Sequence, residues 1–181
     1  MSRYIFILGR NPELSLAEII SYLEARKIQK KIISKQDNLL LIEAEINPSE
    51  MIYSLGGTIA IGKTLATGNE EEILSYIKKN PIYYGEENKF QYSILNFSEI
   101  NVEDAVKENF KKEKLKAIRK NPELAPEQLK NLQNYFVYED CFGIIQSVYD
   151  TEDAEKRDME KPVRRSKLAI SPRLAKILIN L

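Results

Sequence analysis

The stretch RYIFILGRNPELSLAE, residues 3–18, decides how the chain begins to fold. Its first part is a continuous apolar run that ends at Gly9, which is typical of a buried β-strand. Asn11-Pro12 then turns the chain, and Ser15 followed three residues later by Glu18 has the spacing of a capping box. We therefore expect a buried strand and, directly after it, a helix with one apolar face.

The chain continues with the same alternation of strands and helices. Runs of β-branched and apolar residues bounded by turn residues predict strands, and an Asn-Pro pair followed by an apolar spacing predicts a short helix. These elements are strands at residues 28–34, 39–45 and 58–67, and a helix from Asn47 to Gly56. The resulting order, β-α-β-β-α-β, is that of the split-βαβ or ferredoxin-like arrangement. We assign residues 1–68 to a ferredoxin-like N-terminal domain.

A second α/β domain is expected over residues 69–155. Its predicted elements are a helix at 69–79, a loop at 81–88, a strand at 90–95, a helix from Asn101 to about Lys120, a short helix within 121–132, and strands at 134–139 and 142–149. A basic linker follows at residues 156–170, and a C-terminal helix at 171–181. The predicted fold class is therefore α+β.

The composition excludes several kinds of site. There is no histidine, which removes Ser-His-Asp and Cys-His nucleophile pairs and His-ligated metals. A single cysteine, Cys141, excludes an internal disulfide and a Cys-rich zinc site. No apolar run approaches the ~20 residues of a membrane span, and no signal-peptide pattern is present, so we expect a cytoplasmic protein. No catalytic, metal-binding or cofactor-binding residue is predicted.

One nucleotide-binding motif is present but is rejected. Residues 57–64 match the pattern G-x-x-x-x-G-K-[ST] of a phosphate-binding loop. In such a loop a strand comes first, free backbone N–H groups surround the phosphates, and a helix follows directly. Here a helix precedes the match, and its interior is β-branched, which favours a strand whose N–H groups are already paired. A nucleotide-binding protein is thus the least favoured alternative.

Charge is distributed unevenly, although the net charge is zero. Residues 156–176 contain eight Lys and Arg against two Asp and Glu (8 − 2 = +6), so the rest of the chain carries −6. Lysines also crowd the outer face of the helix expected at 101–120. Such cations bind phosphates without reading sequence; a merely solvated surface is the alternative. The predicted RNA-binding residues are Lys111, Lys112, Lys116, Arg119, Lys156, Arg157, Lys161, Arg164, Arg165, Lys167 and Arg173.

The C-terminal helix has an apolar stripe that needs a partner. Ser171 at the N-cap and Pro172 at the first helical position predict its start. Leu174, Ile177, Leu178 and Leu181 then follow at helical spacing. A helix of about ten residues is not stable alone in water, so the stripe packs either on the body of the chain or on a further domain, which we favour.

Two stretches resemble a known family. Residues 7–19, ILGRNPELSLAEI, resemble the N-terminus of the archaeal and eukaryotic tRNA guanine-N2 methyltransferases. KRDMEKP at 156–162, followed by LAISPRLAKILINL at 168–181, is similar to the segment that joins that family's RNA-binding half to its catalytic half. With the order of elements, the resemblance extends over the whole chain.

The resemblance implies a ferredoxin-like domain, then a THUMP domain that binds tRNA, then a methyltransferase domain that uses S-adenosylmethionine. That last domain is absent from this sequence, as is the Asn/Asp-Pro-Pro-aromatic motif for the target amine, so no catalytic residue carries over. Residues 171–181 would be the first helix of the missing domain. The alternative is a separate RNA-binding subunit that docks a methyltransferase through this helix; in either case, this chain alone is expected to be inactive.

Overall fold

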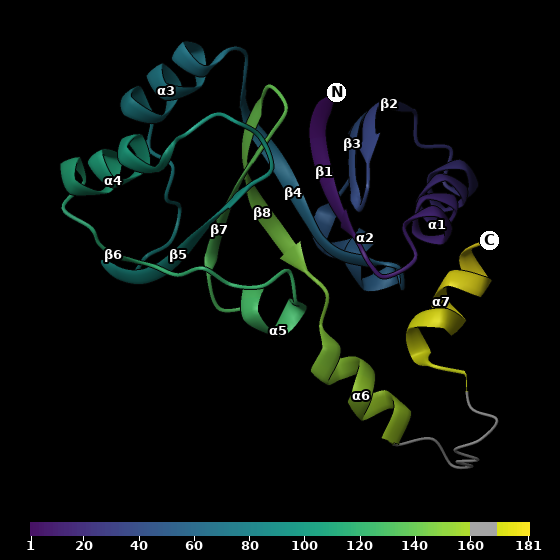
Figure 1. Ribbon diagram of the computed structural model, residues 1–181. Coiled ribbons are helices and arrows are strands. Elements are labelled where there is room, and N and C mark those ends of the chain that lie inside the picture. Colours follow the sequence, from purple (N-terminus) through teal and green to yellow (C-terminus); the bar gives the residue numbers. More distant parts are fainter. Residues whose placement is uncertain (160–169) are drawn as a thin grey trace. The chain divides into compact units, whose positions relative to one another are not determined.

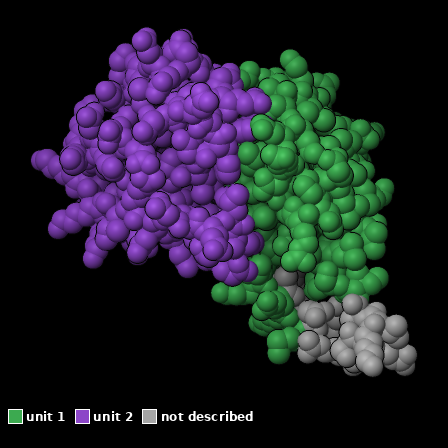
Figure 2. Space-filling model, in the orientation of Figure 1, with its two compact units in different colours: residues 1–62, 146–181 green, residues 63–145 purple. Residues whose placement is uncertain are grey.

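The computed structural model describes residues 1–159 and 170–181, and within them eight strands and seven helices. They form two compact units: residues 1–62 with 146–181 make unit 1, and residues 63–145 make unit 2 (Figure 2). The α+β fold class is confirmed. The unit boundaries fall inside two strands, at residues 62–63 in the strand Thr58–Thr67 and at 145–146 in the strand Cys141–Val148. The domain boundaries expected from the sequence, at residues 68 and 155, follow the ends of these strands.

Unit 1 has the expected order of elements, β-α-β-β-α-β (Figure 1). These are β1 (Ser2–Leu8), α1 (Pro12–Ala25), β2 (Lys30–Gln36), β3 (Leu39–Ala44), α2 (Pro48–Ser54) and the first half of β4 (Thr58–Thr67). The strand order is β2-β3-β1-β4, and β3 pairs antiparallel with both β1 and β2. Unit 1 also contains α6 (Thr151–Met159) and α7 (Pro172–Asn180).

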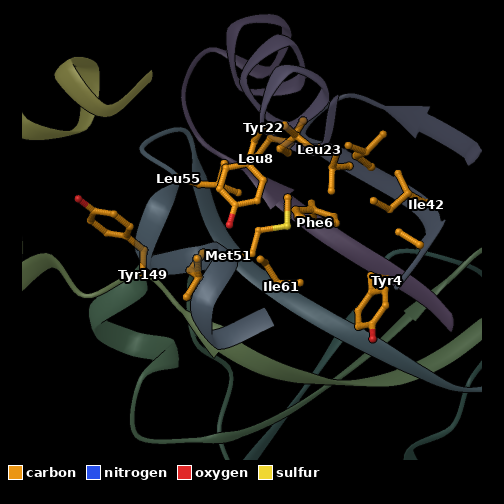
Figure 3. Packing of buried hydrophobic residues seen from close by; sticks show 14 residues of the cluster. Tyr4, Phe6, Leu8, Tyr22, Leu23, Ile42, Met51, Leu55, Ile61 and Tyr149 are labelled. Carbon is orange, nitrogen blue, oxygen red and sulfur yellow. The ribbon is translucent and has the colours of Figure 1, made fainter. Parts of the chain in front are cut away.

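The core of unit 1 explains the continuous apolar run of β1. Alternate residues Tyr4, Phe6 and Leu8 pack with α1 and α2 in one cluster (Figure 3). The residues between them, Ile5 and Ile7, are also fully buried. A strand that is buried on both faces requires apolar side chains at every position, which is the pattern the sequence shows.

Unit 2 has its own core, which is rich in aromatic rings. Its elements are α3 (Glu70–Lys79), β5 (Lys89–Asn96), α4 (Glu103–Lys112), β6 (Lys116–Arg119), α5 (Pro126–Leu129), β7 (Gln133–Tyr138) and most of β8 (Cys141–Val148). The strand order is β8-β7-β5-β6; β5 is parallel to both neighbours, and β7 is antiparallel to β8. Phe110 of α4 contacts Phe90 and Tyr92 edge-on, at centroid distances of 5.2 and 5.0 Å.

Three expectations about secondary structure are wrong. The helix from Asn101 does not reach Lys120, because α4 ends at Lys112 and Lys114 adopts a positive φ of 57°. The Leu115 N–H then bonds back to the Phe110 carbonyl at 2.9 Å, and the chain leaves the helix to form β6. The capping box expected at Ser15 and Glu18 is wrong, because α1 already begins at Pro12 and both residues lie inside the helix. The linker was expected to begin at residue 156, but residues 156–159 belong to helix α6.

Gly143 of β8 allows close packing in unit 2. A Cβ at this position would collide with the carbonyl oxygen of Lys63 and with the ring of Phe136. We expect Gly143→Ala to lower the free energy of unfolding by about 1–3 kcal/mol in urea titrations, because the added atom forces backbone to move. Gln146→Ala, at an exposed position of the same strand, should change it by less than about 0.5 kcal/mol. Equal stability of the two variants would contradict this packing.

Among the described residues, no helix has the length and apolarity needed to cross a lipid bilayer.

Candidate nucleic-acid interface

Five exposed lysines of unit 2 gather where α4 ends and where β5 and β6 begin. Lys111 and Lys112 close α4, and Lys114 lies in the turn that follows. Lys116 and Lys89 are the first residues of β6 and β5, and they lie directly opposite each other in the parallel register. The Lys116 N–H also donates to the Asn88 carbonyl at 2.7 Å, which fixes this corner. We call these five residues the basic edge.

The lysines of the basic edge lack acidic partners, in contrast to other cations of unit 2. Within the described residues, none of the five lies within ion-pair distance of a carboxylate. Lys107, by comparison, lies 3.9 Å from Glu103 and 3.8 Å from Asp104, and Arg119 pairs with Glu103. Unpaired ammonium groups that are fully hydrated can exchange water and counterions for phosphates at little cost.

Aromatic side chains lie in the loop that leads into β5. Tyr83 stacks on Phe90 with centroids 3.9 Å apart and rings 6° from parallel, so its ring is already engaged. Tyr84 is 63% exposed, and its hydroxyl donates to the Pro81 carbonyl at 3.2 Å. The buried Tyr135 hydroxyl donates to the Ile82 carbonyl at 3.0 Å and anchors the loop. Tyr84 therefore presents a held ring on which a nucleic-acid base can stack.

The tyrosine that anchors this loop stays neutral. Burial raises the pKa of the Tyr135 hydroxyl well above its ordinary value. Its hydroxyl hydrogen thus remains available to the Ile82 carbonyl throughout the pH range in which proteins are handled.

The structure brings together only part of the RNA-binding set expected from the sequence. Lys111, Lys112 and Lys116 belong to the basic edge, whereas Arg119 is 31% exposed and paired with Glu103. Lys156 is exposed on α6, and Arg173 lies on α7, so both belong to unit 1. The side chain of Arg157 and the residues Lys161, Arg164, Arg165 and Lys167 lie outside the described residues. Two residues of the basic edge, Lys89 and Lys114, are not in the expected set, and Lys89 could not be placed from the sequence because its position depends on the strand register.

Helix α7 is held against unit 1 by polar and apolar contacts. The Arg173 Nε donates to the Gly56 carbonyl at 2.8 Å, and the Asn180 amide donates to the Ser54 carbonyl at 3.0 Å. Ile177 is buried, with 7% of its surface exposed. The other residues of the predicted stripe remain accessible: Leu174 is 39% exposed, and Leu178 and Leu181 are each 54% exposed. The stripe is thus divided between the body of the chain and an open face.

The motif at residues 57–64 has the structure of a strand. Thr58 to Thr67 form β4, and the next helix begins only at Glu70. The Gly57 N–H, which a phosphate-binding loop would direct at its ligand, donates instead to the Glu18 carboxylate at 2.8 Å. This geometry disagrees with that of a phosphate-binding loop. Among the described residues, no group of acidic and cysteine side chains is arranged to hold a metal ion.

Comparisons with known proteins find similarity in structure alone. No protein-family model matches the sequence, and no curated protein matches it. A 4-thiouridine synthetase, solved with RNA and bound ATP, is 13% identical with a TM-score of 0.55, over 82% of this chain and 42% of that chain. A possible methylase from Clostridium difficile is 16% identical with a TM-score of 0.50, over 99% and 48%. A protein from Listeria monocytogenes, described as a predicted N6-adenine-specific DNA methylase, is 12% identical with a TM-score of 0.51, over 100% and 48%.

At these identities the similarity establishes the fold and nothing finer. The chain spans less than half the length of each of these three structures. It therefore has the α+β fold of a region that, in these proteins, is accompanied by further polypeptide.

Proposed function

We propose that this chain is the RNA-binding region of an RNA-modifying enzyme, a THUMP-type module that positions tRNA for a methyltransferase domain using S-adenosylmethionine. The observation that carries the proposal is the basic edge, five exposed lysines without acidic partners in the described residues, together with the exposed Tyr84 in the loop that leads into β5. Two further findings support it. One structurally similar protein was solved with RNA, and two others are described as methylases.

The proposed mechanism separates binding from chemistry. The lysines of the basic edge contact backbone phosphates, which fixes the position of an RNA without reading its sequence. Tyr84 stacks on an unpaired base, and stacking of this kind adds about 1–3 kcal/mol for each base. The module holds the RNA so that its target guanosine reaches a catalytic pocket in another domain, which raises the effective concentration of the two reactants. The cofactor supplies the methyl group there, and this chain contributes orientation alone.

Binding of tRNA by the isolated chain tests the proposal. We expect a mobility shift of labelled tRNA with a dissociation constant of roughly 1–100 μM at moderate salt, the range of contacts made mainly to phosphates. We also expect no transfer of methyl groups from labelled S-adenosylmethionine to the tRNA. A neutral polymer such as dextran should not compete, whereas unlabelled tRNA should. Absence of any shift at a chain concentration of about 1 mM would refute the proposed function.

A second candidate function rests on the open face of α7. Leu174, Leu178 and Leu181 are accessible on a helix that is otherwise anchored to unit 1. Exposed leucines on one helix face are typical of a surface that packs on another protein. The chain would then be a separate subunit that docks a methyltransferase through residues 171–181. Co-purification of a methyltransferase that is lost in Leu178→Asp, with tRNA binding unchanged, would favour this alternative.

A further inference from the structure

A cleft of about 320 Å³ lies in unit 1 between α7, the start of α1 and the Gly56-Gly57 segment. We call it the α7 cleft. Two of its lining residues are cations, Arg10 and Arg173, and among its described lining residues none is acidic. Leu14 and Leu174 give it apolar walls. This volume lies at the lower end of the range of small-molecule sites, which is about 300–1,000 Å³.

Arg173 is held in the cleft by a fixed geometry. Its Nε donates to the Gly56 carbonyl, and its guanidinium carbon lies 4.7 Å from the ring centroid of Tyr149. Gly9 permits this position, because a Cβ there would lie 3.2 Å from Arg173 Nη2 and 2.9 Å from the Gly57 carbonyl oxygen. The planar group is thus positioned before any ligand arrives, so little conformational entropy is lost on binding.

Arg10 provides a second cation that is not neutralised. Its side chain is exposed, and it has no hydrogen-bond or ion-pair partner among the described residues. The nearest buried acid, Glu18, is already engaged, since the N–H groups of Gly56 and Gly57 donate to its two oxygens at 2.8 Å. Two cations therefore line the cleft, and the N-terminus of α7 at Ser171 adds a partial positive charge beside them.

We infer that the α7 cleft binds one phosphate-bearing nucleotide of the RNA, with its phosphate on Arg10 and Arg173 and its sugar or base against Leu14 and Leu174. Guanidinium groups bind phosphate oxygens through two parallel hydrogen bonds, whereas a lysine ammonium binds them as a point charge. This inference rests on the proposed function, since it identifies a second contact for the same RNA. The two contacts differ in what they bind: the lysines of the basic edge contact several backbone phosphates, whereas the cleft would hold one nucleotide.

Binding of adenosine monophosphate to the full chain, measured by calorimetry, tests the inference without RNA. We expect saturable binding that is at least about tenfold weaker for adenosine and for Arg10→Ala, because a hydrogen bond to a charged group contributes that factor or more. The exposed Arg10 has no hydrogen bond or ion pair with the described residues, so its variant should fold normally. Lys112→Glu/Lys116→Glu, in the other unit, should bind adenosine monophosphate as the wild type does.

Competition separates the two sources of a phosphate ligand. If tRNA displaces adenosine monophosphate from the wild type, a nucleotide of the RNA occupies the cleft as inferred. If saturating tRNA leaves the bound nucleotide in place, the ligand is a free nucleotide and the inference is overturned. Equal affinity for adenosine, or an unchanged affinity in Arg10→Ala, would also overturn it, while a persisting tRNA shift would leave the proposed function intact.

Discussion

Glu18→Ala is expected to reduce the free energy of unfolding by about 2–5 kcal/mol. Glu18 is fully buried, and its carboxylate accepts hydrogen bonds from the backbone N–H groups of Gly56 and Gly57 at 2.8 Å each. It also accepts one from the Asn180 side chain at 2.9 Å, which ties α7 to α1. Alanine would leave two buried N–H donors without partners, and each such donor costs about 1–3 kcal/mol.

Urea titration of Glu18→Ala against Glu24→Ala measures this effect. Glu24 lies on the same helix but is exposed, and its surface ion pair with Lys30, at 2.9 Å, should contribute less than about 1 kcal/mol. Glu18→Gln should fall between the two, since its amide oxygen can still accept from one of the glycines. If Glu18→Ala were as stable as Glu24→Ala, the buried carboxylate would not hold α1, α7 and the Gly56-Gly57 segment together.

The double variant Lys112→Glu/Lys116→Glu is expected to bind tRNA at least about 25-fold more weakly than the wild type at roughly 0.1 M salt. Each phosphate contact contributes roughly a factor of five under these conditions, and reversal of charge adds repulsion. Both lysines are exposed and belong to the basic edge. Filter binding with labelled tRNA gives the two dissociation constants directly.

The control for this variant carries the same change in charge elsewhere. Lys27 and Lys31 are exposed in unit 1, outside the basic edge. Lys27→Glu/Lys31→Glu should weaken tRNA binding by no more than about threefold, through the change in net charge alone. Equal losses in the two double variants would mean that tRNA responds to total charge and that the basic edge is not its binding surface.

Much of the fold could be predicted because its signals are local. The apolar run of residues 4–8 predicted β1, and the order β-α-β-β-α-β followed from turns and β-branched runs. Helix starts were predicted correctly where a side chain caps them. Asn47 accepts from the N–H groups of Ser49 and Glu50, Asn69 forms a full capping box, and Ser171 accepts from the Leu174 N–H. Each of these interactions spans only a few residues of sequence.

The errors arise where a distant contact overrides the local pattern. The lysine-rich sequence of residues 111–116 favours a continuing helix. Instead β6 forms, because its backbone pairs with that of β5 from Lys89–Lys116 to Tyr92–Arg119. No glycine marks the end of α4, since Lys114 itself takes the left-handed conformation. Glu18 has the spacing of a cap residue, yet it bonds to glycines that lie far along the chain.

The candidate site was predictable in part for the same reason. Lys111 and Lys112 are consecutive, so their charge is visible in the sequence. Lys89 joins Lys116 through the strand register alone, and Arg119 at the end of β6 is neutralised by Glu103 at the start of α4, a pairing that no spacing rule anticipates. The α7 cleft depends on the approach of Arg173 to Gly9, two residues at opposite ends of the sequence.

The salt dependence of tRNA binding tests the central claim most directly. If the basic edge binds phosphates through its five lysines, the logarithm of the association constant should fall linearly with the logarithm of the salt concentration. Its slope should be about −3.5 to −4.5, from roughly 0.7–0.9 for each of five contacts, and should become shallower by about 1.5 in Lys112→Glu/Lys116→Glu. A wild-type slope near zero, or the same slope in both proteins, would contradict binding through these lysines.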